Sequence, residues 1–373
     1  MGANFLILLL SAAPLQASPP DTTSPDSSPA APPIERVAAD SFSDSPAHGI
    51  AYERLTDIVR YDRVQGLSFG VGYRVRVPGI AYARLYGTVR YGLSDQRVAG
   101  RLTVLRDAPG GRFMLSGYRE ISALDPFAPG HGFGNSLDAL FAAHDNGDYL
   151  LVHGVSLAYE VPLRMALALG LGVNVQREES VDREARSAIN DFFGGSGLFP
   201  PNPQVAEGTY GSFWARLDGY GKRRWRVTAD LQAGDGRSTG RVYGAIRQDF
   251  GGRRGATLDV KAGVATNPTL PQALFRLGGV STVRGFEYGA LSGQAFWAAR
   301  LDIAPIRGRL RPVLFADAGQ AARVDDLFSS KALIGAGVGL SVFDGILRLD
   351  LSHPISPDIG GNMRFDIVVQ AAR

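Results

Sequence analysis

The stretch from residue 275 to residue 319 decides the fold. It reads Phe275-Arg276-Leu277-Gly278-Gly279, then Val283-Arg284-Gly285-Phe286, then Arg300-Leu301-Asp302, then Phe315-Ala316-Asp317-Ala318-Gly319. An arginine on a glycine-flanked loop is thus followed by an aspartate on each of two later alternating segments. Because side chains alternate between the two faces of a strand, Asp317 shares a face with Phe315, and Asp302 shares one with Arg300. We expect both acids to point to the same side of a sheet.

Alternation with a period of two extends far beyond this stretch. From Leu67 to Val77 every odd residue is apolar and every even residue is small or charged. The same pattern recurs in 225–232, 258–261 and 347–352. Such segments are typical of strands with one apolar face and one charged face. The 47 glycines, 13 tyrosines and 19 phenylalanines, with 45% hydrophobic residues, also suit an all-β chain.

Two architectures produce this alternation. A soluble sandwich packs its apolar faces into a shared core, and charged residues on so many opposite faces are unusual there. A transmembrane barrel turns the apolar face toward lipid and the charged face toward an aqueous or plugged lumen, with about 10 residues per strand. The pattern favours the barrel.

Counting strands gives sixteen, an even number, as expected for a single-chain bacterial barrel. The sequence therefore predicts a transmembrane antiparallel β-barrel of 16 strands. The expected strands are 61–77, 81–94, 98–107, 112–124, 136–144, 148–161, 164–178, 208–220, 223–235, 239–250, 254–266, 294–304, 309–319, 332–343, 346–354 and 363–371.

Loop lengths set the expected orientation. The long connections 179–207, 267–293, 320–331 and 355–362 fall on the outer side if the first strand rises from the periplasm. Short turns such as Asp344-Gly345 fall on the inner side. The connection 125–135 is an exception, because it is long and is assigned to the periplasmic side.

The N-terminal segment has the features of a secretory signal. Phe5 to Leu10 form a short apolar core, and Leu15-Gln16-Ala17 ends in a small residue suited to cleavage. A membrane anchor is the alternative, but a spanning helix needs about 20 apolar residues. We expect a signal peptide over 1–17, a disordered proline- and serine-rich linker over 18–50, and the barrel over 51–373.

Several functions lack support in the sequence. The net charge of +3 comes from arginines scattered singly through strands, which does not favour nucleic-acid binding. The chain has no cysteine, and its five histidines show no metal-binding spacing. No nucleophile elbow accompanies its serines. We expect no enzyme activity, cofactor, metal or nucleic-acid partner.

The order of Val283-Arg284-Gly285-Phe286, Phe315-Ala316-Asp317-Ala318-Gly319 and Gly335-Ala336-Gly337-Val338-Gly339 resembles the bacterial surface-antigen or outer-membrane assembly-factor superfamily. Its members include protein-insertion barrels and two-partner-secretion transporters. The resemblance is strong over about the last hundred residues. It implies that an extracellular loop folds back into the barrel lumen, where the loop arginine pairs with acids on the inner wall.

We therefore expect Arg284 to bond to Asp317, with Asp302 as a second or indirect partner. The family motif places Gly285, Phe286, Phe315 and Gly319 at the same site. The plainer interpretation is that each charge is a solvated lumen residue, as Arg348 or Asp259 would be. Gly335-Ala336-Gly337-Val338-Gly339 is best interpreted as a strand whose lumen face is all glycine and leaves room for the loop, since no helix follows to bind a dinucleotide.

The resemblance also implies a location and partners. We expect a bacterial outer-membrane protein that contacts outer-membrane lipids and has a weak seam between its first and last strands. Nothing between Ser18 and Arg60 is long enough for a periplasmic polypeptide-binding domain. Three functions stay open: a minimal insertion or translocation pore for unfolded outer-membrane or secreted proteins, with a periplasmic partner in trans; a structural or surface-antigen barrel; and a barrel enzyme.

Overall fold

The computed structural model describes residues 48–52, 55–164, 166–192, 194–251, 255–306, 308, 310–342, 347–356, 359 and 362–369. The predicted signal peptide, the predicted linker up to residue 47 and the predicted hairpin at Asp344-Gly345 lie outside these residues.

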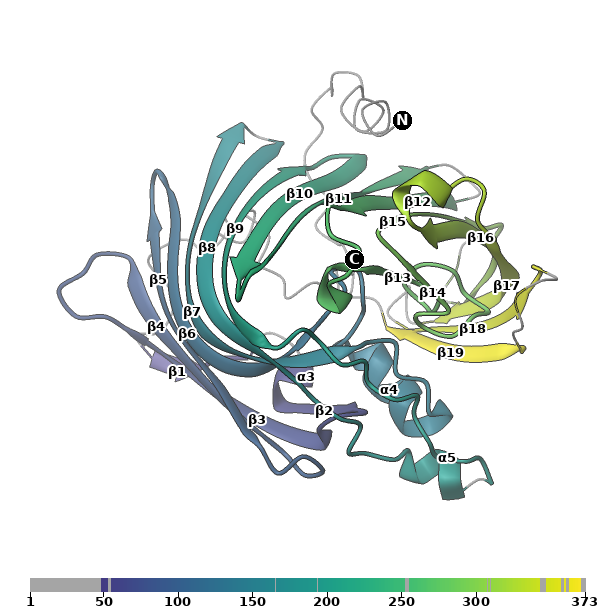
Figure 1. The fold of residues 1–373 in the computed structure, drawn as a ribbon, viewed down its shortest axis with the longest axis horizontal. Coiled ribbons are helices and arrows are strands. Elements are labelled where there is room, and N and C mark those ends of the chain that lie inside the picture. Colours follow the sequence, from purple (N-terminus) through teal and green to yellow (C-terminus); the bar gives the residue numbers. More distant parts are fainter. Residues whose placement is uncertain are drawn as a thin grey trace.

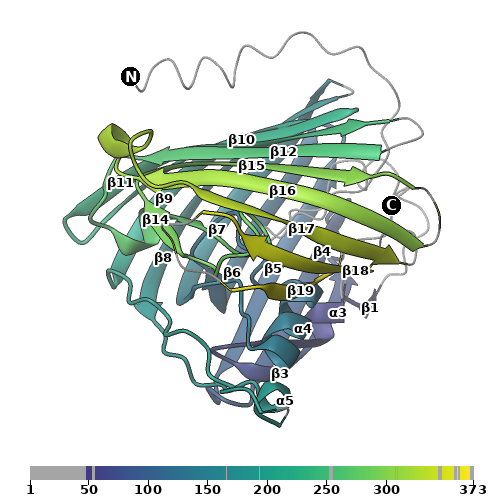
Figure 2. The same ribbon diagram turned by 90° about the vertical axis from the view of Figure 1, so that its right-hand side faces the viewer.

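The described residues form one large antiparallel sheet of seventeen strands. Strands β1 and β2 both pair with β3, one with each half of it, so they share one position and the wall has sixteen positions. Figures 1 and 2 show this wall as a curved ribbon with helices at one end. Its strands are β1 (His48–Ile50), β2 (Val59–Asp62), β3 (Gly66–Arg76), β4 (Ala83–Gly92), β5 (Val98–Ala108), β6 (Gly111–Ala123), β7 (Tyr149–Arg164), β8 (Leu167–Ser180), β9 (Gly208–Gly219), β10 (Arg223–Gly234), β11 (Arg237–Phe250), β12 (Gly255–Ala265), β15 (Ala295–Ala304), β16 (Leu310–Ala322), β17 (Leu333–Val342), β18 (Leu347–Pro354) and β19 (Arg364–Val369).

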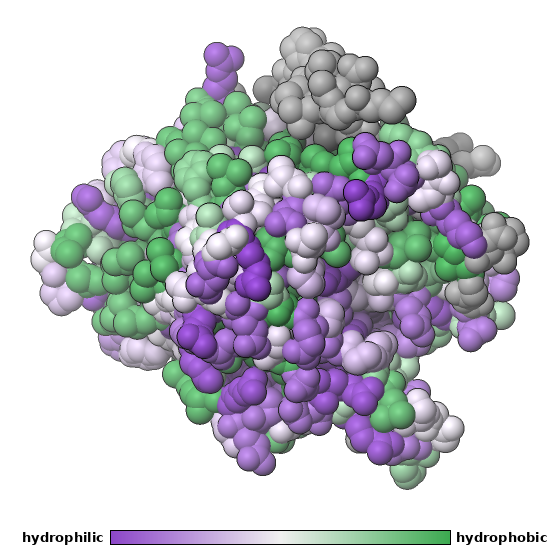
Figure 3. All heavy atoms as spheres, viewed as in Figure 1, coloured by the Kyte–Doolittle hydropathy of each residue, from purple (hydrophilic) through white to green (hydrophobic). Residues whose placement is uncertain are grey.

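The two faces of the wall differ in the way the alternation predicts. Leu115, Leu157 and Val173 are direct cross-strand neighbours on β6 to β8, and all are about half exposed. The adjacent row is polar and points the other way, into the lumen, because side chains alternate along each strand. Figure 3 shows apolar residues gathered on the outer flank beside β4 and β5. The outer surface is thus suited to lipid.

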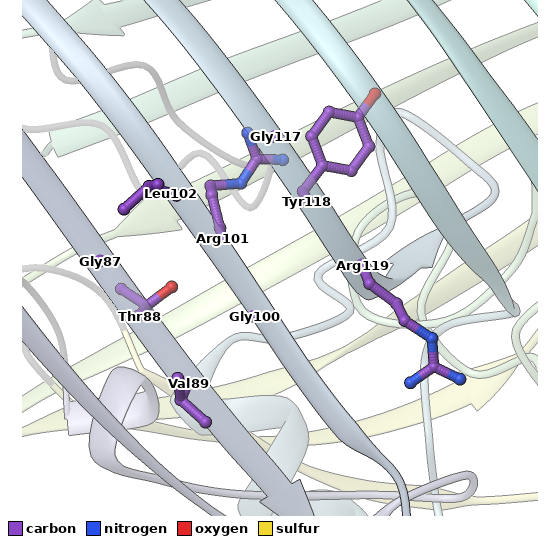
Figure 4. A pocket seen from close by; sticks show the side chains of 9 residues that line it. All are labelled: Gly87, Thr88, Val89, Gly100, Arg101, Leu102, Gly117, Tyr118 and Arg119. Carbon is purple, nitrogen blue, oxygen red and sulfur yellow. The ribbon is translucent and has the colours of Figure 1, made fainter.

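A shallow hollow interrupts this apolar surface on β4 to β6 (Figure 4). Gly87, Gly117 and Leu102 are aligned across the three strands, so the leucine has a glycine on each side. From the opposite face, the Arg101 guanidinium stacks 4.4 Å from the centre of the Tyr118 ring. The hollow is therefore a gap in the outer side-chain layer, whereas the polar pair belongs to the lumen.

The predicted strand 136–144 is wrong. Residues 136–142 belong to helix α4 (Phe133–Ala142), which lies in the connection between β6 and β7. The apolar residues Phe133, Leu137, Leu140 and Phe141 follow helical spacing, and in a short segment this is easily mistaken for alternation. The sixteenth position is instead filled by β1 and β2, which are separated by the short helix α3 (Leu55–Ile58).

This correction removes the exception in loop placement. With β1 and β2 as the first position, the long connection 124–148 lies at the same end as 181–207, 266–294 and 323–332, since antiparallel neighbours alternate in direction. Helix α5 (Ala188–Phe192) lies in the second of these connections, and the 3-10 helix η2 (Val324–Asp326) in the fourth. No helix among the described residues combines the length and hydropathy needed to cross a bilayer as a helix.

A charge on the outer face tests the orientation of the wall. We expect Leu157→Arg to lower the free energy of unfolding in liposomes by about 2–4 kcal/mol, because arginine near the bilayer centre is costly. Ser156→Arg, one residue along on the lumen face, is the control and should change it far less. Denaturant titration measures both, and equal losses would contradict the assignment of faces.

Candidate functional site: a buried arginine in the lumen

The connection 266–294, which we call the lumen loop, lies inside the curve of the wall beside β15 to β18 (Figure 1). It contains the 3-10 helix η1 (Pro271–Ala273) and a small hairpin of β13 (Phe275–Leu277) and β14 (Leu291–Gly293). An apolar cluster holds it there. The cluster contains Phe275, Leu277, Val283 and Phe286 from the loop and Ala265, Phe296, Ala298, Ala321 and Leu333 from the wall.

Arg284 lies on this loop with its side chain fully buried. Its Nε and Nη2 donate to the two carboxylate oxygens of Asp317 over 2.7 and 2.6 Å, and its backbone N–H donates to the same group over 3.0 Å. Nη2 also donates to Asp302 over 2.8 Å, and Nη1 donates to Asp350 over 3.2 Å. The guanidinium carbon lies 3.7 Å from the centre of the Phe315 ring. The structure brings Arg284 together with both aspartates that the sequence singles out.

Asp350 and Arg348 are the site residues that sequence reasoning missed. Arg348 donates to Asp302 over 2.7 Å and to Asp350 over 2.6 Å, so it joins two of the acids that hold Arg284. Its side chain is buried, which contradicts its interpretation as a solvated lumen residue. A signal was present: Arg348 and Asp350 lie two residues apart on one face of a strand beside the glycine-rich strand.

The whole cluster balances its charges. Arg300 lies 3.8 Å from Asp317, which brings the group to three guanidinium groups and three carboxylates. Burying ions is costly unless they are paired and hydrogen-bonded, and the fork of an arginine suits such pairing. Burial by itself lowers the pKa of Arg284, but the carboxylates, with Asp317 contributing most, outweigh burial and raise that pKa above its ordinary value. Arg284 is therefore a permanent cation.

Glycines make the space for the loop, as the sequence of β17 predicts. A Cβ atom at Gly335 would lie 2.0 Å from the carbonyl oxygen of Arg284. At Gly337 it would meet the Phe315 ring, and at Gly339 the Asp350 carboxylate. On β16, a Cβ atom at Gly319 would lie 3.1 Å from Leu277 of the loop. A larger side chain at any of these positions would displace part of the cluster.

Gly285 and Phe286 complete the turn that presents the arginine. Gly285 has a φ of +91°, a conformation that favours glycine, and its backbone lies against His353 of β18. Phe286 then points into the apolar cluster and is 1% exposed. The charged contact of Arg284 and the apolar contact of Phe286 thus come from residues two apart in one turn.

A second arginine fixes the lumen loop to the opposite part of the wall. The Arg276 backbone N–H donates to Asp125 over 3.0 Å, and its Nε donates to Asp148 over 2.5 Å. Both acids flank the connection between β6 and β7, where Asp148 also lies 3.5 Å from Arg63. The loop therefore spans the lumen between two charged anchors.

The described residues contain no group of three or more histidine, aspartate or glutamate side chains arranged to hold a metal ion. Each acid of the cluster already accepts from arginine. What this arrangement can do chemically is to hold a loop in place.

Comparisons with known proteins agree with this geometry. Residues 255–342 match the family model described as haemolysin secretion/activation protein ShlB/FhaC/HecB. The structure is similar to that of BamA from Haemophilus ducreyi lacking POTRA domains 1–3, with a TM-score of 0.59 and 15% identity over 90% of this chain and 76% of that one. No curated protein sequence matches the chain.

CdiB from Acinetobacter baumannii gives a TM-score of 0.49 and 14% identity over 84% of this chain. CdiB from Escherichia coli gives a TM-score of 0.46, also with 14% identity over 84% of this chain. The chain spans 58% and 61% of the length of these two proteins.

The wall and its inserted loop define the class of this protein, an antiparallel transmembrane β-barrel with an occupied lumen. The matched segment contains Arg284, Asp302 and Asp317, and the barrel fold is similar to that of BamA. Both matches agree with the resemblance to the outer-membrane assembly-factor superfamily that the sequence motifs indicate.

Removing the first anchor should release the lumen loop. We expect Arg284→Ala to leave three aspartates, two of them fully buried, facing two arginines and to destabilise the barrel by about 3–5 kcal/mol. Limited proteolysis of the folded protein should then cut within 267–293. The exposed arginine in Arg106→Ala is the control and should leave the loop protected. A loop equally resistant in both variants would contradict the anchoring.

The two arginine anchors should protect the lumen loop from protease to different degrees. Arg276→Ala alone should increase cleavage of the loop less than Arg284→Ala, because Arg276 has one carboxylate on its side chain and Arg284 has three. The double variant should be cleaved fastest of all. Proteolysis rates on the three variants check this, and a double variant no faster than Arg284→Ala would show that Arg276 does not anchor the loop.

Proposed function

We propose that this chain is a bacterial outer-membrane barrel that assists the insertion or translocation of proteins, with its lumen loop locked at rest by Arg284, Asp302 and Asp317. The observation that carries the proposal is that these three residues lie within the segment matched by a secretion-protein family model. The proposal assigns no catalytic chemistry to the barrel, since each acid of its charged cluster is paired with an arginine.

The proposed route is the seam between the first and last positions of the wall. In the part of the chain that the structure describes, strand β2 has four residues and β19 has six. Each edge strand therefore presents only a few backbone N–H and C=O groups. An edge strand presents backbone N–H and C=O groups that can pair with an added strand. An unfolded outer-membrane or secreted protein would pair at this seam. We also propose that a periplasmic protein in trans delivers clients to this seam.

Site-specific cross-linking tests this function. A photoreactive residue at Phe365, which is half-exposed on the outer face of β19, should capture unfolded outer-membrane or secreted proteins in living cells. The same residue at Leu157, equally exposed on the far wall, is the matched control and should capture only lipid. Capture at the seam alone supports the proposal.

A structural or surface-antigen barrel is the alternative outcome. It predicts no client at either position, and no periplasmic protein in a pulldown from outer membranes. The filled lumen is the observation that favours it, because the loop and its apolar cluster occupy the interior. Absence of seam-specific capture in cells that secrete actively would decide for this alternative.

A further inference from the structure

Helix α4 lies against both edges of the wall, at β2 and at β19. The Tyr61 N–H of β2 donates to the Ser136 hydroxyl over 3.1 Å. The Ile367 N–H of β19 donates to the Asp138 carboxylate over 2.6 Å. One turn of the helix therefore supplies a hydrogen-bond acceptor to a backbone amide of β2 and another to a backbone amide of β19.

The contact with β19 is also a close backbone approach. A Cβ atom on Gly134 would lie 2.8 Å from the Ile367 carbonyl oxygen and 2.9 Å from the Val369 nitrogen. The helix can sit this close only because residue 134 is glycine. Gly134, Ser136 and Asp138 are all buried, so the residues that meet the two edge strands are small or polar.

The connection 181–207 covers the other side of the helix. The Ser187 hydroxyl donates to the Leu140 carbonyl over 2.6 Å. Ala139 packs in an apolar cluster with Ala185 and Phe199, against which Tyr61 of β2 also packs. The helix is thus clamped between the seam and a second loop.

Asp138 is a buried acid close to a second acid at the seam. Burial and the nearby Asp366 raise the pKa of Asp138 well above its usual value.

An edge amide that already donates to a side chain cannot donate to an incoming strand. Strand addition depends on free edge amides. We propose that α4 is a latch: Gly134, Ser136 and Asp138 hold the seam at rest, and the helix must leave before a polypeptide strand can add to β19. This inference rests on the proposed function, because it assigns a regulator to the seam.

Two variants release the latch by different means. Gly134→Val inserts a side chain where the helix meets β19, and Asp138→Ala removes the acceptor of the Ile367 amide. Each has a control. A Cβ atom at Gly117 on the outer face would meet nothing within 4 Å, so Gly117→Val tests the substitution itself. Asp138→Asn retains an acceptor oxygen.

Hydrogen–deuterium exchange of the full chain in nanodiscs is the measurement. We expect the segment 364–369 to exchange about fivefold faster in Gly134→Val and in Asp138→Ala, because one hydrogen bond contributes roughly 1 kcal/mol. Gly117→Val and Asp138→Asn should exchange like the unsubstituted chain. Unchanged exchange in Asp138→Ala or in Gly134→Val would overturn the latch.

Cross-linking at Phe365 separates this inference from the proposed function. More client capture in the released variants supports both. Faster exchange without any client capture keeps the latch and refutes the transport function. Client capture at equal yield in all variants, with unchanged exchange, refutes the latch and keeps the function.

Discussion

The structure depends on the burial of one guanidinium group. Arg284 has no contact with bulk water, so it must find compensating charge in the protein. Asp317 accepts from its side chain through both carboxylate oxygens, and Asp302 and Asp350 take the remaining donors. Once that constraint is met, the loop that carries Arg284 is fixed to three separate strands of the wall.

Neighbouring features follow from the same constraint. The cluster needs room, and β17 provides it by presenting glycine to the lumen at three successive positions. The cluster also needs neutrality, which Arg300 and Arg348 supply. The apolar residues around Phe286 exclude water from one side of the loop, and the anchor at Arg276 holds its far end. The lumen is thus a packed interior in which charge pairs and apolar contacts both hold the loop.

Much of this could be predicted from the sequence, because strand alternation and the glycine face are local patterns. The pairing of Arg284 with Asp317 and Asp302 was expected from motifs that lie within 34 residues of one another. Asp350 was missed because its role depends on the register between β17 and β18, which places it beside Gly339. Register across strands is set by the whole wall and is not written in any one segment.

Helix α4 was missed for a different reason. Its apolar residues follow helical spacing, but its buried residues are small or polar: Gly134, Asn135, Ser136, Asp138 and Ala139. The division of the first position between β1 and β2 likewise leaves no alternating run long enough to predict. Both features lie at the seam, where contacts with other parts of the chain outweigh local preference.

A double-mutant cycle on Arg284 and Asp317 tests the central claim most directly. The free energy of unfolding in liposomes would be measured for Arg284→Met, Asp317→Asn and the pair, with the unsubstituted chain as reference. A locking ion pair predicts a coupling energy of at least about 2 kcal/mol, since each single change leaves a buried charge unpaired. A coupling energy within about 0.5 kcal/mol of zero would mean that the two residues act independently, and it would contradict the account.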